Sequence, residues 1–251
     1  MSGHNKWSTI KRKKGALDAK RSKIFSKIIK EISVAVRESG GDPDSNPKLR
    51  LCLQNAKGVN MPKETISRAI TKASDEGSNL HELTFEGYAP GGIGIFIECL
   101  SDNNNRTVSS IRATFSKRSG TLGTNGSLSF LFDRMGVFNI LKEHAQHIDH
   151  DQFELEVIDA GAEDFEEYDD RIVITTVMEN FGPMNKKLEE LKIEVENAEL
   201  RRIPNDYKIL DIDSAKKVLK LVEEFEDNED VQNVYHNLSI TDDLMTSLES
   251  E

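Results

Sequence analysis

Basic residues gather near the start of this chain, in a pattern suited to binding a polyanion. Ten Lys or Arg residues lie between Lys6 and Lys30, and a single acid, Asp18, lies among them. Ammonium and guanidinium groups bind phosphates and release condensed counterions, which produces an affinity that falls with salt. Such contacts position a protein on nucleic acid without reading its sequence. The stretch therefore predicts a nucleic-acid-binding face.

Nine of these basic side chains are predicted to contact phosphate: Lys6, Lys11, Arg12, Lys13, Lys14, Lys20, Arg21, Lys23 and Lys27. Apolar residues recur at helical spacing from Asp18 onward, so the later lysines share a face beside a stripe that packs inward. A merely solvated lysine face is one alternative. A membrane-surface helix is another, but few exposed apolar anchors accompany the charges.

Two further features could contact nucleic acid. The single tryptophan, Trp7, either stacks on a base or pins an irregular segment to its own domain, and packing is the favoured interpretation. Asn103, Asn105 and Arg106 lie where a predicted strand ends and a helix begins, and the amides at a helix N-terminus favour phosphate. The alternative for this loop is a helix cap that binds no ligand.

Patterns of enzymes and metal sites are weak in this sequence. His144, His147 and His150 fan around a helix at steps of three with no adjoining cysteine, which favours a solvated loop over a metal site. GYAPGGIG lies between two strands, which favours a turn over a phosphate loop. The acidic run GAEDFEEYDD is interpreted as a solvated edge. We therefore expect no enzymatic activity, catalytic residue, metal, cofactor or small-molecule substrate.

Charge divides the chain into two parts. Residues 1–72 hold 17 Lys/Arg and 6 Asp/Glu, a net charge of +11, whereas residues 73–251 hold 16 and 38, a net charge of −22. Such asymmetry indicates a polyanion-binding segment on an acidic body. No apolar run is long enough to span a membrane. Cys52 and Cys99 lie in apolar patterns typical of a reducing compartment, so a cytoplasmic location is expected.

The order of predicted elements indicates an α+β multidomain fold, with an N-terminal three-helix domain followed by two α/β sandwich domains. Residues 1–78 form the basic helical domain. Strands at 83–88 and 93–100, a helix at 106–118 and a strand at 127–132 follow. Residues 136–202 have the β-α-β-β-α-β order of a ferredoxin-like sandwich.

A late helix, 213–225, and a late strand, 231–236, have too little to pack on alone. We expect them to return to the sheet of residues 83–132. That return makes 134–204 an inserted ferredoxin-like domain and assembles the other α/β domain from 79–133 plus 205–251. The tail, residues 242–251, is expected to be frayed.

Several long segments of the chain resemble the YebC family. They include GHNKWSTIKRKKGALDAKRSKIFSKIIKEI, NMPKETISRAI, EGYAPGGIGIFIECLSDNNNRT and FSKRSGTLGTNGSLSFLF. The resemblance implies a cytoplasmic protein with a helical domain and two α/β domains, the third inserted within the second. Members are usually designated probable DNA-binding transcriptional regulators. A mitochondrial relative is a translational activator, and bacterial members are connected with ribosomes stalled at proline-rich stretches.

The resemblance carries binding residues but no catalytic ones. The family's basic positions match Lys6, Lys11, Lys14, Lys20, Arg21 and Lys23. Its loop motif matches Asn103, Asn105, Arg106 and Thr107, and the chain departs at Asn104, where many members have a cation.

The function expected is a nucleic-acid-binding regulator of gene expression, in the first place a DNA-binding transcriptional regulator. One alternative is a ribosome-associated translation factor that binds ribosomal RNA or tRNA and aids translation of proline-rich sequences. A protein–protein adaptor that uses the acidic domains is the alternative of another class.

Overall fold

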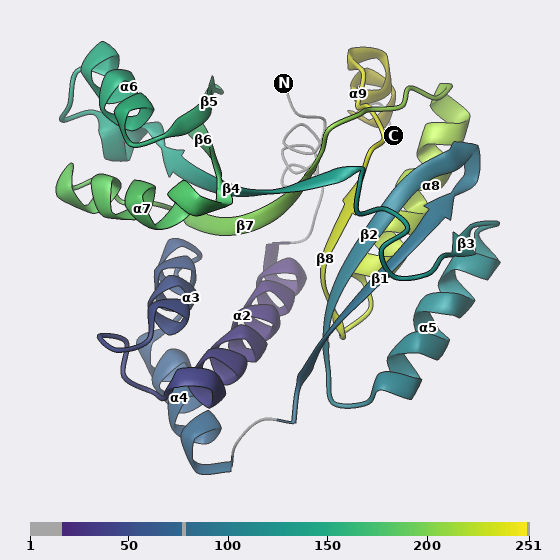
Figure 1. Cartoon of the computed structure of the whole chain (residues 1–251), viewed down its shortest axis with the longest axis horizontal. Coiled ribbons are helices and arrows are strands. Elements are labelled where there is room, and N and C mark those ends of the chain that lie inside the picture. Colours follow the sequence, from purple (N-terminus) through teal and green to yellow (C-terminus); the bar gives the residue numbers. More distant parts are fainter. Residues whose placement is uncertain (1–16, 77–78, 250–251) are drawn as a thin grey trace. The chain divides into compact units, whose positions relative to one another are not determined.

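The structure, a computed structural model, describes residues 17–76 and 79–249 (Figure 1). The chain forms two compact units, each described by itself below. One unit contains Asn79–Asp133 and Ile203–Glu251, and the other contains Asp18–Ser78 and Arg134–Arg202. The predicted α+β multidomain fold is confirmed, because a run of three helices is followed by two four-stranded sheets with helices packed on them, whereas the predicted three-domain boundaries stay a prediction.

Three helices open the second unit: α2 (Leu17–Ser39), α3 (Pro47–Gly58) and α4 (Lys63–Glu76). The buried Asn46 is the N-cap of α3, and its side-chain oxygen accepts from Leu49 N at 3.0 Å. Its amide nitrogen donates to the carbonyl oxygens of Ala35 (2.7 Å) and Gly40 (2.8 Å). One side chain therefore begins α3 and joins it to the end of α2.

The apolar stripe predicted for the first helix is confirmed from Ile28 onward, whereas Ile24, the first residue of the predicted stripe, is 43% exposed. Ile28, Ile32, Ala35 and Val36 are buried together with residues of the next two helices, namely Leu49, Cys52, Ala56, Ala69 and Ala73. Gly40 has a φ of 84°, a left-handed conformation that ends α2 and that glycine adopts without strain. Burial raises the pKa of Cys52 to about 12, so this thiol stays protonated.

The second sheet has the strand order β5-β6-β4-β7, and its elements follow one another along the chain in the predicted β-α-β-β-α-β order. Its elements are β4 (Phe132–Leu141), α6 (His150–Asp159), β5 (Ala162–Glu167), β6 (Arg171–Val177), α7 (Phe181–Glu190) and β7 (Asn197–Pro204). β6 pairs antiparallel with both β4 and β5. Phe138 and Ile174 of this sheet share a core with Phe153 of α6 and Leu188 of α7.

The first unit contains the other sheet, with strand order β3-β1-β2-β8. Its strands are β1 (His81–Ala89), β2 (Ile93–Ser101), β3 (Thr121–Leu122) and β8 (Val231–His236), and its helices include α5 (Asn104–Lys117) and α8 (Ile212–Glu226). β8 pairs antiparallel with β2, with Phe96 opposite Tyr235. The predicted return of the late strand to this sheet is therefore confirmed.

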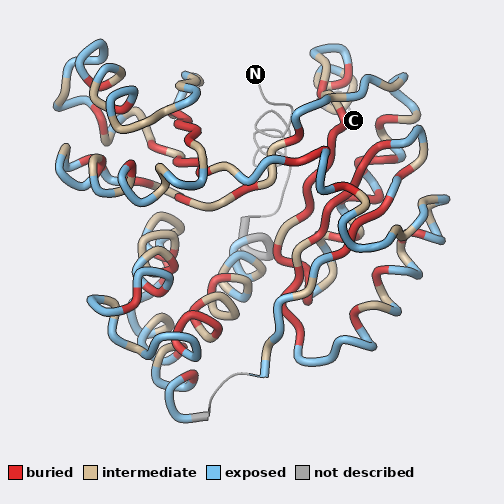
Figure 2. Tube along the Cα trace, in the orientation of Figure 1, coloured by how far each residue is buried: buried red, intermediate tan, exposed pale blue. Residues whose placement is uncertain are grey.

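Strand β2 is buried on both faces, as Figure 2 shows along its length. Ile95 and Ile97 lie in a core with Phe115 of α5 and Phe225 of α8, whose rings are 4.7 Å apart. Phe96 points to the opposite face, because successive residues of a strand alternate. There it packs with Leu128, Leu131, Phe132 and Tyr235. This double burial explains the nearly unbroken apolar run of β2.

The predicted strand at 127–132 is wrong. Residues 125–131 form turns, and only Phe132 belongs to a strand, the first residue of β4. The buried carboxylate of Glu86 accepts from Gly126 N at 2.7 Å and from Leu128 N at 2.5 Å. Those bonds hold the segment in a coil that covers the sheet face around Phe96. A distant carboxylate thus overrides the local apolar pattern.

The expectation of a frayed tail is also wrong for most of its length. Residues Asp242–Glu249 form helix α9. Leu244 is buried in the core that includes α8, and Met245 and Leu248 pack against it. The helix forms because its apolar side chains find a partner surface that the sequence alone does not reveal.

We predict that Glu86→Ala lowers the free energy of unfolding by about 2 to 3 kcal/mol, because two amides lose a charged acceptor inside the protein. Urea unfolding measures the change. Glu82→Ala, at an exposed position of the same strand, is the matched control and should shift stability by less than about 0.5 kcal/mol. Equal effects of the two variants would contradict the role assigned to Glu86.

Acid should destabilise the first unit through His236, which is buried in β8. Burial lowers its pKa from 6.5 to about 4. In the unfolded chain this imidazole is protonated below about pH 6.5, whereas in the folded chain it is protonated only below about pH 4. The free energy of unfolding therefore falls as the pH drops from about 6.5 to about 4. The loss is on the order of 3 kcal/mol. His236→Leu should flatten that part of the profile in urea unfolding between pH 4 and 7.5, and an unchanged slope would refute the assignment.

Candidate nucleic-acid interface

Among the basic residues predicted between Lys6 and Lys27, those that the structure describes lie on α2. Arg21 is exposed, and its guanidinium donates to Asn60 O at 3.0 Å while lying 5.4 Å from the ring centroid of Phe25. Lys23 and Lys27 are half-buried and four residues apart, so they are neighbours on the helix surface. The buried stripe around Ile28 and Ile32 fixes the rotation of α2 and hence the direction of these cations.

The other predicted contacts of the N-terminal stretch are described only in part or lie outside the described residues. Lys20 lies in the first turn of α2, and only its backbone is described. The other predicted contacts lie outside the described residues: Lys6, Trp7, Lys11, Arg12, Lys13 and Lys14. The packing and stacking interpretations of the tryptophan therefore both stay predictions.

The polar loop before α5 is held by a network of its own. Asn103 is the N-cap of α5 and accepts from Arg106 N at 3.1 Å. The hydroxyl of the buried Thr107 donates to Asp230 Oδ2 at 2.8 Å and lies 2.7 Å from Ser101 Oγ. The Arg106 guanidinium donates to Asp230 Oδ1 at 3.0 Å. The structure thus joins Arg106 and Thr107 to one carboxylate, while Asn103 O accepts from the Thr107 hydroxyl at 3.1 Å.

Electrostatics reinforce that network. The hydrogen bond to Asp230, followed by the one to Asp102, raises the pKa of Arg106. Burial by itself would raise the pKa of Asp230, but the hydrogen bonds from Thr107 and Arg106 outweigh burial and hold this pKa below its ordinary value. Asp230 therefore stays ionised at neutral pH and neutralises the loop's cation.

These contacts limit what the loop can offer a phosphate. Thr107 is buried and its hydroxyl is engaged, and the Asn103 side chain caps its own helix. Asn105 is exposed, and the Arg106 side chain keeps 54% of its surface accessible. Of the four predicted contact residues in this loop, Asn105 and the outer part of Arg106 are therefore the ones most accessible to a ligand.

Helix α4 adds three exposed cations that were not among the predicted contacts, Lys63, Arg68 and Lys72. The Arg68 side chain donates to Glu64 O at 3.3 Å. Hydrophobic periodicity could have indicated them, because all three lie beside the apolar positions Ile66, Ala69 and Ile70 of the same helix.

The three histidines of the 144–150 run point to separate partners. His144 Nδ1 lies 2.9 Å from Glu194 O, and His147 Nε2 lies 2.9 Å from Leu191 O. His150 pairs with the Glu167 carboxylate. Among the residues that the structure describes, no group of three or more His, Cys, Asp or Glu side chains could hold a metal ion.

None of the described helices is both long enough and apolar enough to cross a membrane.

Comparison with known proteins supports a single family. A model described as the TACO1/YebC protein N-terminal domain matches residues 5–76. A second model, described as the TACO1/YebC second and third domain, matches residues 80–238.

Full-length relatives and a solved structure agree with these models. A probable transcriptional regulatory protein of Idiomarina loihiensis is 45% identical over 252 residues, covering 99% of this chain and 100% of the relative. Another, of Geobacillus sp. (strain WCH70), is 48% identical over 240 residues, covering 95% and 97%. The crystal structure of a conserved hypothetical protein from Aquifex aeolicus matches with a TM-score of 0.80 and 38% identity, covering 90% of this chain and 93% of that one. Since the two models together span most of its length, this chain belongs to the TACO1/YebC family.

Proposed function

We propose that this chain is a regulator of gene expression that binds nucleic acid through its basic N-terminal residues. The observation that carries the proposal is the charge division, with a net of +11 in residues 1–72 and −22 in residues 73–251. The relatives named probable transcriptional regulatory proteins support a regulatory role, with DNA as the first candidate partner. The proposed activity is binding, without catalysis or cofactor, and its proposed location is the cytoplasm.

The proposed interface combines described and undescribed residues. Arg21, Lys23 and Lys27 on α2 extend the basic run of residues 11–14. The apolar stripe of the same helix is buried, so one side of α2 packs while the other is directed toward a phosphate backbone. Asn105 and Arg106 are proposed as secondary contacts at the start of α5.

A second candidate function is a translation factor that binds ribosomal RNA or tRNA. The observation that favours it is the strongly acidic remainder of the chain, which a long DNA duplex would repel. Recognition by charge and shape suits a compact, folded RNA, because no sequence-reading set of side chains is required. DNA and RNA probes are therefore compared in both tests below.

Reversing three charges should separate binding from folding. In K11E/R12E/K14E, we expect at least a hundredfold loss of affinity for duplex DNA or structured RNA, because phosphate contacts become repulsive. Fluorescence anisotropy measures affinity, and the circular-dichroism melt should not change.

The matched control for this variant is K186E/K217E/K220E, which makes the same change in net charge at other sites. It should keep nearly full affinity. Binding retained by K11E/R12E/K14E, or lost equally in the control, would refute the proposed face.

Salt dependence should report the number of phosphates contacted. A plot of log affinity against log salt is expected to fall with a slope of about −0.9 per contact for duplex DNA and about −0.7 for single strands. The K11E/R12E/K14E variant should reduce the magnitude of this slope by about two contacts or more. A flat plot for the unmodified protein would show that phosphates are not the target.

A further inference from the structure

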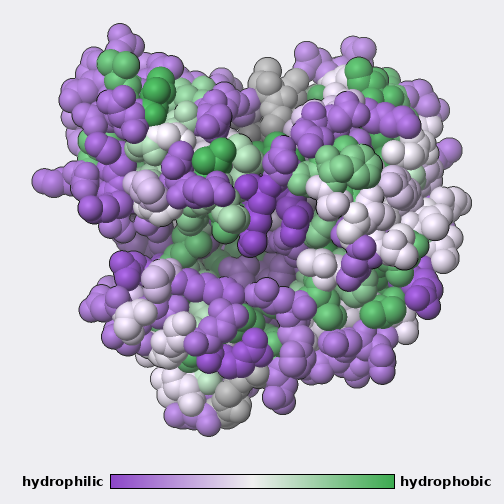
Figure 3. All heavy atoms as spheres, in the orientation of Figure 1, coloured by the Kyte–Doolittle hydropathy of each residue, from purple (hydrophilic) through white to green (hydrophobic). Residues whose placement is uncertain are grey.

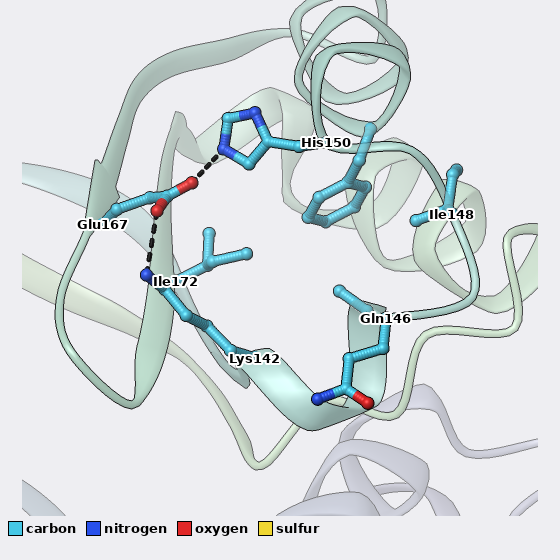
Figure 4. Close-up of a pocket in the computed structure, with 8 residues that line it drawn as sticks. Lys142, Gln146, Ile148, His150, Glu167 and Ile172 are labelled. Atoms are coloured by element: carbon cyan, nitrogen blue, oxygen red, sulfur yellow. Dashed lines mark hydrogen bonds and ion pairs between the residues drawn. The ribbon is translucent and has the colours of Figure 1, made fainter.

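A pocket of about 340 Å³ lies between α6 and the hairpin of β5 and β6. Four apolar and four polar residues line it: Ala145, Ile148, Phe153 and Ile172, with Lys142, Gln146, His150 and Glu167. Figure 4 shows Ile148 and Ile172 on opposite sides of the hollow, with the polar groups around its rim. The lining therefore suits a ligand that places an apolar group in the pocket and polar groups against the rim.

A charged clasp closes one side of the rim. The Glu167 carboxylate accepts from Lys142 Nζ at 2.9 Å and also bonds His150 Nε2 (Figure 4). The bonds from Lys142 and His150 lower the pKa of Glu167, and the bond to Glu167 raises the pKa of His150. Because Glu167 engages both Lys142 and the imidazole of His150, the rim offers little positive charge to an anionic ligand.

Exposed acids are sequence neighbours of the lining residues, although the Asp170 carboxylate pairs with Arg171 and the Asp149 side chain caps α6. These acids are Glu143, Asp149, Asp151, Asp169 and Asp170. Lys142 N donates to Asp170 O at 3.0 Å, so the β5–β6 turn lies beside the pocket. Figure 3 shows mainly hydrophilic side chains over α6 and β5, with small hydrophobic patches among them.

The whole inserted segment has the same sign of charge. Residues 134–202 hold 8 Lys/Arg and 18 Asp/Glu, a net charge of −10. Such a field attracts cations and repels nucleic acid and anionic metabolites. Charge and cavity together therefore select an occupant that is basic on the outside and apolar at one point.

We propose that this pocket docks a basic protein segment, by taking up one bulky apolar side chain while flanking Lys or Arg residues pair with the acids at the rim. The apolar side chain is the anchor, because a buried side chain in a pocket contributes most of the affinity of such an interface. The rim acids attract the segment and select against acidic partners. This interaction is separate from the nucleic-acid interface, so either can fail without the other.

Two synthetic peptides test the proposal with the full chain. One has a central Phe with three Lys on each side, and the other has Ser in place of Phe. The Phe peptide should bind at least roughly tenfold more tightly, because burial of an aromatic side chain stabilises the complex by that order. NMR amide shifts should be largest around Ile148 and Ile172.

Variants localise the anchor. Ile148→Ser should bring the Phe peptide down to the affinity of the Ser peptide, whereas Leu155→Ser, on the exposed side of α6, should leave it unchanged. If Ile148→Ser fails to fold in a circular-dichroism melt, Ala145→Leu, which fills the pocket from its wall, replaces it as the test.

Charge is tested in the same assay. E143Q/D169N should weaken both peptides several-fold, and E179Q/D164N, which removes the same charge at exposed positions outside the pocket lining, should not. Equal affinity for the two peptides, or unchanged binding after the pocket is altered, would overturn the proposal. Displacement of the peptide by a structured RNA would also overturn it, because the face would then bind nucleic acid.

Discussion

Pairing of β8 with β2 is the interaction on which the rest of the first unit depends. β2 is buried on both faces, so its side chains need cover on each side of the sheet. Its buried backbone groups also need a hydrogen-bonded strand on each edge, and β1 and β8 are those strands. The chain supplies the second edge only after a long insertion, when β8 returns. Leu100 N donates to Asp230 O at 2.8 Å, and the Asp230 side chain accepts from Arg106 and Thr107. Asp230, which directly precedes β8, thus joins the returning segment to the start of α5.

The insertion is tolerated because its two ends enter adjacent regions of the same unit. Asn205 N donates to Leu131 O at 3.0 Å, and its side-chain amide donates to Phe130 O at 2.9 Å. Residues before and after the insertion are therefore joined directly. The second unit satisfies its own edge in a related way, since the Asn55 side chain of α3 both donates to and accepts from the backbone of Ala198 at 2.9 Å. An amide side chain there takes the place of a neighbouring strand for the outer strand β7.

Opposite charges are kept on separate segments, and each sign suits a different partner. The basic residues precede or belong to the helical segment, whose apolar stripe is buried and whose cations remain on its surface. The inserted segment combines net negative charge with a pocket, a pairing that favours a basic peptide over a polyanion. The proposed nucleic-acid face and the proposed peptide pocket carry opposite charge, so the two proposed partners would not compete for one surface.

Much of this structure follows from local sequence patterns. The apolar stripe of α2 from Ile28 onward and the βαββαβ order were both predicted, because hydrophobic periodicity acts over a few residues. The sequence by itself also determined the charge division. Only the tertiary structure decided that residues 125–131 coil around Glu86, that α9 forms, and that Thr107 and Arg106 bind Asp230. Each of those depends on a partner far along the chain, and local periodicity holds no information about which distant groups become neighbours.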